Sequence, residues 1–184
     1  MTPSNSDRFT CRRCGACCIG DGSVFLLPDD IRAIGRHLGI SLQETVDRYT
    51  EFLILELRDE EQGYLYLPYL TLRKNEKNAC LFLRDKLCSI EPAKPAQCRE
   101  TPFVEEFFTD AEWRETLRRD CPALRAMPQG ALPRPEDFPG APLRERAYLD
   151  LLREHRYSLE EILGVTLPGP RLVSDTEQDT HSTR

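Results

Sequence analysis

The sequence predicts a small α+β domain that is stabilised by metal and consists of a short β-hairpin or sheet with several helices around it. Several segments carry apolar residues at helical spacing, and two apolar arms flank a charged turn. The eight cysteines are divided among distant segments of a 184-residue chain. This length suits one domain with a real core. Because ligands from distant segments would have to converge, we expect folding to be coupled to metal binding.

The densest group of cysteines lies near the N-terminus, where Cys11, Cys14, Cys17 and Cys18 fall within eight residues. Charged neighbours argue against a role as packed hydrophobes. A CxxC segment lets two thiolates reach one metal from a tight turn, and Gly15 permits such a turn. Adjacent side chains of an extended backbone point to opposite sides. Cys17 and Cys18 therefore leave two arrangements open, in which one thiol turns away or the pair serves two sites.

The segment after these cysteines predicts a strand and two helices. Residues 23–27 form a short apolar stretch, which favours a strand. A helix over 29–38 follows, because proline and two acids precede its apolar stripe and Gly39 comes after it. Ser41 and Glu44 form a capping box that begins the second helix.

The middle of the chain predicts strands. Residues 64–67 are aromatic and apolar and end at Pro68, which indicates a strand near a sheet edge. Residues 80–88 predict a hairpin with its turn near Arg84 and Asp85. Cys80 and Cys88 would then lie nearly opposite each other, with Cβ atoms about 5 Å apart, a spacing that suits two ligands of one metal.

Two further cysteines follow. Prolines at 92 and 95 restrict the loop that leads to Cys98 and so fix the direction of its thiol. A short helix around residues 111–119 leads to Cys121, for which both a ligand and a plain buried thiol stay open.

The domain organisation follows from composition. We expect a flexible N-terminus (1–8) and a cysteine-cluster metal-binding domain (9–127). A proline- and glycine-rich linker (128–142) leads to a C-terminal helical segment (143–172) packed on the domain, in which Ser158 caps the last helix. The polar residues 173–184 predict a disordered tail.

Composition also excludes classes of function. The net charge of -6 argues against a nucleic-acid partner. No apolar run approaches the roughly 20 residues that span a bilayer, and no secretory signal is evident, so we expect a cytoplasmic protein without a membrane partner. In a reducing compartment, eight cysteines favour metal ligands or catalytic thiols over disulfides, which stay as the last alternative.

The cysteines together predict a metal site. The candidate ligands are Cys11, Cys14, Cys17, Cys18, Cys80, Cys88, Cys98 and Cys121. They allow two four-cysteine centres, or one with surplus thiols. Sulfur ligands suit either zinc or an iron–sulfur cluster and exclude magnesium and calcium. The surplus thiols and the vicinal pair favour the iron–sulfur cluster slightly. Arg12, Arg13 and Arg99 would offset the thiolate charge or lie solvated at the surface.

Three stretches carry a resemblance to a known family: CRRCGACC, FLLPDDIRAIGRHLGIS and CLFLRDKLCSIEPAKPAQCRETPF. Together they resemble the CxxCxxCC cysteine-cluster family of zinc- or iron-chelating domains from Phe9 to Phe103. The chain departs from the usual pattern at Lys94-Pro95, where the family has Arg-Pro, and at Thr101-Pro102, where Phe-Pro is common. The resemblance implies a bound metal, with every candidate cysteine except Cys121 as a ligand.

The main hypothesis is therefore a metal-binding protein with a structural, sensory or metal-handling role, whose partner is a metal ion or cluster. A protein partner is compatible with this role but is not identified. A related domain occurs in flagellin lysine N-methylases, where an iron–sulfur cluster accompanies methyl transfer, although only the cysteine-rich part is similar. A cluster-dependent methylase-related or redox enzyme and a thiol-based redox sensor thus stay as alternatives.

Overall fold

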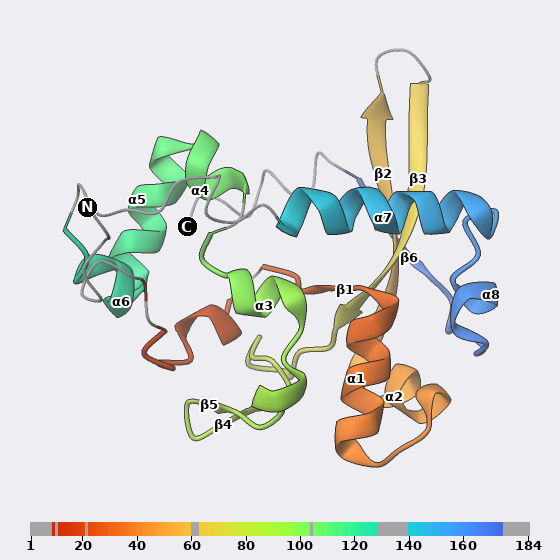
Figure 1. Cartoon of the computed structure of the whole chain (residues 1–184), viewed down its shortest axis with the longest axis horizontal. Helices are drawn as coiled ribbons and strands as arrows, with labels where there is room; N and C mark the ends of the chain where they lie inside the picture. Colours follow the sequence, from red (N-terminus) through yellow and green to blue (C-terminus); the bar gives the residue numbers. More distant parts are fainter. Residues whose placement is uncertain are drawn as a thin grey trace.

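The computed structural model describes residues 9, 11–20, 22–59, 63–103, 105–128 and 140–174. Helices surround a four-stranded sheet and a separate two-stranded sheet, which confirms the predicted small α+β fold (Figure 1). In chain order the elements are η2 (Ala16–Cys18), β1 (Phe25–Leu26), α1 (Pro28–Leu38), α2 (Leu42–Tyr49), β2 (Thr50–Asp59), β3 (Gly63–Leu72), β4 (Leu83–Arg84), β5 (Leu87–Cys88), η3 (Glu91–Ala93), α3 (Ala96–Glu100), α4 (Glu105–Thr109), α5 (Ala111–Asp120), α6 (Pro122–Arg125), α7 (Gly140–Glu154), α8 (Leu159–Leu163) and β6 (Arg171–Ser174).

The larger sheet has the strand order β1-β3-β2-β6, with β6 parallel to β2 and the other pairs antiparallel. Strand β3 lies between β1 and β2 in the sheet order and continues past Pro68 to Leu72. Among the described strands, residues 63–69 pair with β2 alone, so the stretch that ends at Pro68 lies locally at a sheet edge, as predicted. Proline is tolerated there because β1 pairs only with Leu70 and Thr71, so Pro68 lies beyond the end of that short ladder. Strand β2 was not predicted from the sequence.

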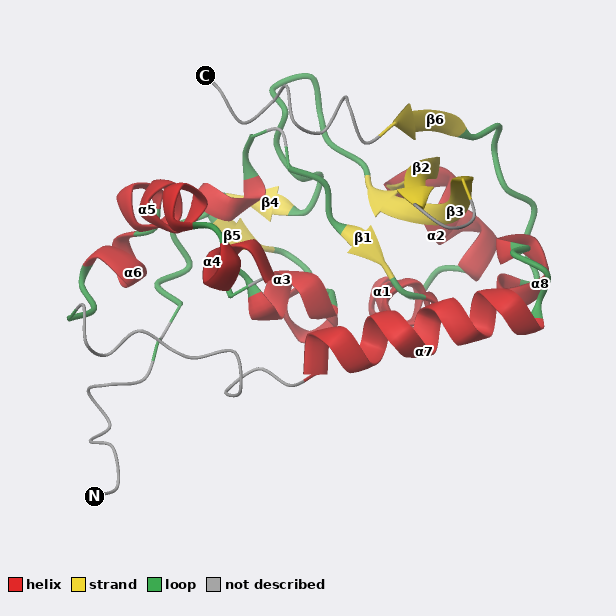
Figure 2. Ribbon diagram, turned by 90° about the horizontal axis from the view of Figure 1, so that it is seen from above, coloured by secondary structure: helices red, strands yellow, loops and turns green. Residues whose placement is uncertain are grey.

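The two predicted helices before the sheet are confirmed. Helix α1 begins at Pro28 and ends before Gly39, and helix α2 begins after Ser41, whose hydroxyl accepts a hydrogen bond from the Glu44 N–H at 3.1 Å. Their buried residues Ile31, Ile34 and Val46 belong to the main core together with strand β3. These helices therefore close one end of the sheet (Figures 1 and 2).

Helices α7 and α8 also contribute to the main core. Helix α7 lies beside α1 along one side of the sheet (Figure 2). The buried side chains of Tyr148 and Leu152 pack in the main core, and the Tyr148 hydroxyl donates a 2.6 Å hydrogen bond to the Pro68 carbonyl. Ser158 caps α8 as predicted. None of the described helices is long and apolar enough to cross a membrane.

Parts of the predicted domain organisation lie outside the described residues: the flexible N-terminus (1–8), most of the linker (129–139) and most of the tail (175–184). At the borders the described elements extend further than expected. Helix α7 begins at Gly140, within the predicted linker, and β6 includes Val173 and Ser174, because residues 171–174 pair with β2.

The contribution of α7 to stability can be tested with one pair of equivalent substitutions. Leu152 is fully buried in the main core, so Leu152→Ala should lower the free energy of unfolding by about 2–5 kcal/mol. Leu172→Ala removes the same atoms from a side chain that is 58% exposed and should change stability by less than about 0.5 kcal/mol. Urea unfolding of the two metal-free variants measures the difference, and equal stabilities would contradict the packing of α7 on the core.

Candidate metal centre

The N-terminal cysteine segment turns at Gly15, which adopts a left-handed conformation with φ 77°. The predicted tight turn is therefore confirmed. A Cβ atom at this position would lie 3.2 Å from Leu83 Cδ1 and 3.3 Å from the Lys86 carbonyl oxygen. Glycine thus lets the segment approach the β4–β5 hairpin closely. The turn leads directly into η2, which carries Cys17 and Cys18.

Backbone contacts hold η2 against the segment that contains Cys80. The Cys80 N–H donates a 2.8 Å hydrogen bond to the Cys18 carbonyl, and the Gly20 N–H donates to the Asn78 carbonyl at 3.0 Å. The Lys74 ammonium also donates to the Gly20 carbonyl. Two segments that are about 60 residues apart in the sequence are thereby fixed side by side.

The β4–β5 hairpin is confirmed, but its predicted register is wrong. The turn residues are Asp85 and Lys86, both with positive φ, and Cys88 lies opposite Leu83 rather than Cys80. A two-residue turn with positive φ at both positions fixes this register. Cys80 instead forms a β-bridge with Lys74, so its thiol reaches the site from outside the hairpin ladder.

Cys98 lies on the short helix α3 rather than in the predicted loop. Both oxygens of the buried Asp30 carboxylate accept hydrogen bonds, from the Leu27 N–H at 3.1 Å and from the Ala96 N–H at 3.0 Å. The Gln97 side chain accepts a 2.7 Å hydrogen bond from the Phe25 N–H. These contacts join α3 to β1 and to the start of α1.

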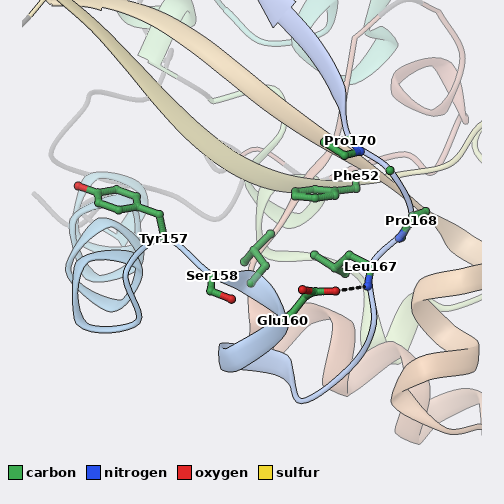
Figure 3. Close-up of a pocket in the computed structure, with 9 residues that line it drawn as sticks. Phe52, Tyr157, Ser158, Glu160, Leu167, Pro168 and Pro170 are labelled. Carbon is green, nitrogen blue, oxygen red and sulfur yellow. Dashed lines mark hydrogen bonds between the residues drawn. The ribbon is translucent and has the colours of Figure 1, made fainter.

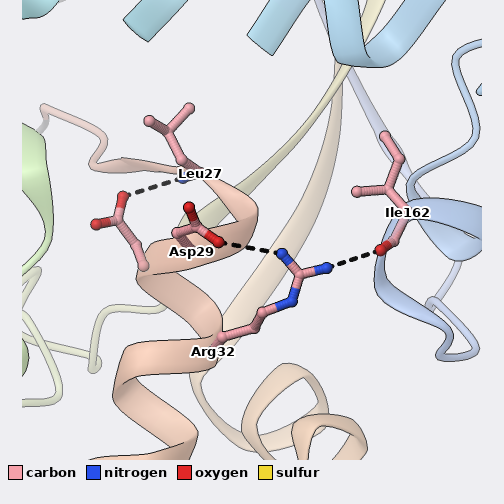
Figure 4. A network of polar contacts seen from close by, with 5 residues as sticks. Leu27, Asp29, Arg32 and Ile162 are labelled. Atoms are coloured by element: carbon pink, nitrogen blue, oxygen red, sulfur yellow. Dashed lines mark hydrogen bonds and ion pairs between the residues drawn. The ribbon is translucent and has the colours of Figure 1, made fainter. Parts of the chain in front are cut away.

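Figure 4 shows how the start of α1 is fixed in turn. The Leu27 N–H donates to the Asp30 carboxylate. The Arg32 guanidinium donates to the Asp29 carboxylate at 3.2 Å and to the Ile162 carbonyl of α8 at 2.9 Å. The position of α3 therefore depends on a network that extends into the C-terminal helices.

Cys17 and Cys18 form a hydrogen-bonded thiol pair. A hydrogen bond from Cys18 is the largest effect on Cys17 and, with the nearby Lys94 ammonium, lowers the pKa of Cys17 to about 6 despite partial desolvation. The same hydrogen bond raises the pKa of Cys18, and burial raises it further. The hydrogen bond and the Lys94 charge therefore favour ionisation of Cys17, while Cys18 retains its proton more strongly.

Three other cysteines lie near this pair: Cys80 and Cys98 interact electrostatically with it, and Cys88 interacts with Cys80 and Cys98. Burial raises the pKa of Cys98 to about 12, and the negative charges of Cys80, Cys17 and Cys88 add to the effect. Burial likewise raises the pKa of Cys80, with a further contribution from Cys88. We call these five thiols, each of which interacts with at least two others, the thiol cluster; its members are Cys17, Cys18, Cys80, Cys88 and Cys98.

The other three candidate ligands are Cys11, Cys14 and Cys121. Cys11 and Cys14 lie on the segment before η2 and are exposed, as Cys17 is, and the Cys11 sulfur accepts a 3.4 Å hydrogen bond from the Arg13 N–H. Cys121 packs against a second, smaller core formed by Phe103, Phe107 and Leu124. Its location beside these apolar residues accords with the alternative of a plain buried thiol.

All eight cysteines are free thiols. Among the described residues, no group of three or more cysteine, histidine, aspartate or glutamate side chains is spaced to hold a metal ion. The donor atoms of the thiol cluster, all sulfur, nevertheless suit zinc and iron. The cluster thus has the right chemistry and proximity for a soft metal, while its sulfur atoms would have to move closer together to ligate one.

One surface cavity in the described part of the chain lies away from the thiol cluster. It has a volume of about 400 Å³, and its lining includes Phe52, Tyr157, Glu160 and the Pro168–Pro170 segment (Figure 3). A second cavity follows the exposed side of α7. Neither is lined by a cysteine.

The sequence matches the CxxCxxCC family, described as "Putative zinc- or iron-chelating domain", over residues 10–122. The chain belongs to this family. The match includes all eight cysteines of the CxxCxxCC protein, and the resemblance seen in the sequence is confirmed. No solved structure matches the chain.

Sequence reasoning missed several residues that shape the site of this CxxCxxCC protein. Asp30 and Gln97 position α3, and Lys74 and Lys94 are the cations that interact with the thiols of Cys80 and Cys98. The sequence suggested three arginines as the cations that offset the thiolate charge. Of these, Arg12 and Arg99 are exposed, and Arg13 lies 3.9 Å from Glu91. The sequence contained one signal for the residues that were missed: Lys94 and Pro95 lie shortly before Cys98, which places a cation near that thiol.

The role of Asp30 in positioning α3 leads to a test. Asp30→Ala leaves two amides of the α1 and α3 termini without acceptors and should lower the free energy of unfolding by about 2–4 kcal/mol. Asp29→Ala, which removes a neighbouring carboxylate that is 97% exposed, should cost less than about 1 kcal/mol. Chemical denaturation of both variants without metal measures this difference, and a mild effect of Asp30→Ala would show that α3 is held by other contacts.

Proposed function

We propose that the protein binds zinc or iron through thiolates of the thiol cluster, and that its biochemical role is structural, sensory or metal-handling. The observation that carries this proposal is the interaction among five thiols supplied by η2, by residues 80–88 and by α3. A chain that used these cysteines only for packing would gain nothing from grouping thiols that repel one another when ionised.

Membership of a zinc- or iron-chelating family supports the same reading independently of the geometry. Since the thiols are near one another but are not at ligand spacing, metal binding would draw the three segments together. This closure couples metal binding to the local fold. Bound metal would supply the positive charge that lets several thiolates share one site.

Between the two chemistries, we favour an iron–sulfur cluster slightly. The thiol cluster has five members, one more than a closed four-cysteine zinc site uses, and the exposed Cys11 and Cys14 are close to it in sequence. Surplus thiols beside a centre suit ligand exchange. Exposed thiols favour a metal-handling or sensory role over a purely structural one, because a metal held at the surface is accessible to a partner.

The direct test is metal analysis of protein purified without oxygen from cells supplied with zinc and iron. We expect stoichiometric metal in the wild-type protein and a lower metal content in Cys98→Ser, because this substitution removes the one thiol that α3 contributes. Cys121→Ser is the matched control: its side chain is also partly buried, yet it lies against the second core and should leave metal content unchanged.

The optical spectrum of the same samples separates the chemistries. Broad visible absorption that bleaches with dithionite would identify an iron–sulfur cluster and keep the enzyme hypothesis open, whereas a colourless zinc protein would exclude both. Wild-type protein without bound metal, or equal metal loss from Cys98→Ser and Cys121→Ser, would contradict the proposed function.

Metal affinity should also depend on pH. Three thiols of the cluster have raised pKa values and hold their protons at neutral pH, so metal must displace these protons when it binds. The apparent affinity for Zn²⁺ should therefore rise between pH 6.5 and 8, by about tenfold per pH unit for each proton released. Competition with a chelator of known pH dependence measures this, and an affinity that stays constant over the range would show that these thiols are not the ligands.

A further inference from the structure

Lys94 stands out among the charged residues around the thiol cluster because its side chain is only 14% exposed. Lysine side chains are rarely buried this far without a partner for the charge. Lys94 lies between η3 and α3, four residues before Cys98. This location brings a cation into the meeting point of the segments that carry the thiols.

The anionic neighbour of Lys94 does not account for this placement. Glu91 Oε2 lies 3.9 Å from the Lys94 ammonium, which is too long for a hydrogen bond. The other oxygen of the same carboxylate lies 3.9 Å from Arg13, so the charge of Glu91 is shared between two cations. An ion pair of this length with a half-exposed partner contributes little to stability.

The nearby thiols explain the low exposure of Lys94 better than Glu91 does. Lys94 interacts electrostatically with Cys17 from η2 and with Cys98 from α3, two cysteines that are 81 positions apart in the sequence. Four thiolates around a divalent metal leave two excess negative charges. The cluster thiols are partly buried apart from the exposed Cys17, and removing part of this charge from water is costly unless a cation lies beside it.

We propose that Lys94 is the internal counter-ion of the metal–thiolate centre, where its ammonium compensates the charge of the thiolates that hold the metal. This inference rests on the proposed function and adds a residue that is not itself a ligand. Removal of the Lys94 charge weakens metal binding while the metal-free fold is retained, since the thiols carry less negative charge before metal binds.

The test measures Zn²⁺ affinity of the full-length protein by competition with a chromophoric chelator. Lys94→Gln and Lys94→Met both remove the charge, and Met keeps an apolar stem of similar length. Both variants weaken Zn²⁺ binding by about 10- to 100-fold, the range for residues that support metal ligands from outside. Lys94→Arg keeps the charge and restores affinity to within about threefold of wild type.

The matched control is Lys77→Gln, which removes an exposed lysine and so makes the same change in net charge. It leaves the affinity unchanged. Thermal unfolding of the metal-free variants separates charge compensation from structural support: the midpoints of Lys94→Gln and Lys94→Met stay at the wild-type value. Wild-type affinity in both neutral variants overturns the inference, as does a lowered midpoint combined with no rescue by arginine. If the wild-type protein itself binds neither zinc nor iron, the proposed function fails as well.

Discussion

Repulsion among crowded thiolates is the physical constraint on which the site depends. Sulfur atoms that ionise near one another raise each other's pKa values, and the site limits this cost by keeping most of them protonated in the absence of metal. The pair of Cys17 and Cys18 illustrates this, since one thiol donates a hydrogen bond to the other, which lowers the pKa of Cys17 and raises that of Cys18. Lys94 then stabilises the Cys17 thiolate. A soft cation would replace the shared protons and allow further thiols to ionise.

The remainder of the fold keeps the thiol-bearing segments in place. Backbone hydrogen bonds join Cys18 to Cys80, and the Asp30 carboxylate joins α3 to α1. Helix α1 is in turn connected to α8 through Arg32, so the C-terminal helices support the site without contributing a ligand. The main core thus acts as the rigid part, while the thiol cluster lies at its edge with Cys80 and Cys88 packed against it.

Local signals in the sequence predicted much of this arrangement. The caps at Ser41 and Ser158 and the glycine turn at Gly15 depend on residues within a few positions of each other, and all three were correct. The predicted register of the β4–β5 hairpin was wrong. Its turn residues Asp85 and Lys86 adopt left-handed conformations, which a sequence usually signals by glycine or asparagine, and neither is present at these positions. The pairing of β1 with the end of β3 also escaped prediction, since β1 contributes only two residues to the sheet. Contacts such as that of Asp30 with Ala96 join residues 66 positions apart and leave no periodic signal.

The central claim is that thiols from three separate segments ligate one metal. X-ray absorption spectroscopy of the metal-loaded protein tests it most directly, because the scattering shell reports the type and number of ligand atoms. For a zinc-loaded sample, the account predicts four sulfur ligands at about 2.3 Å and no nitrogen or oxygen in the first shell. A shell with two or fewer sulfur atoms, completed by nitrogen or oxygen, would contradict convergence of the thiol cluster on one metal.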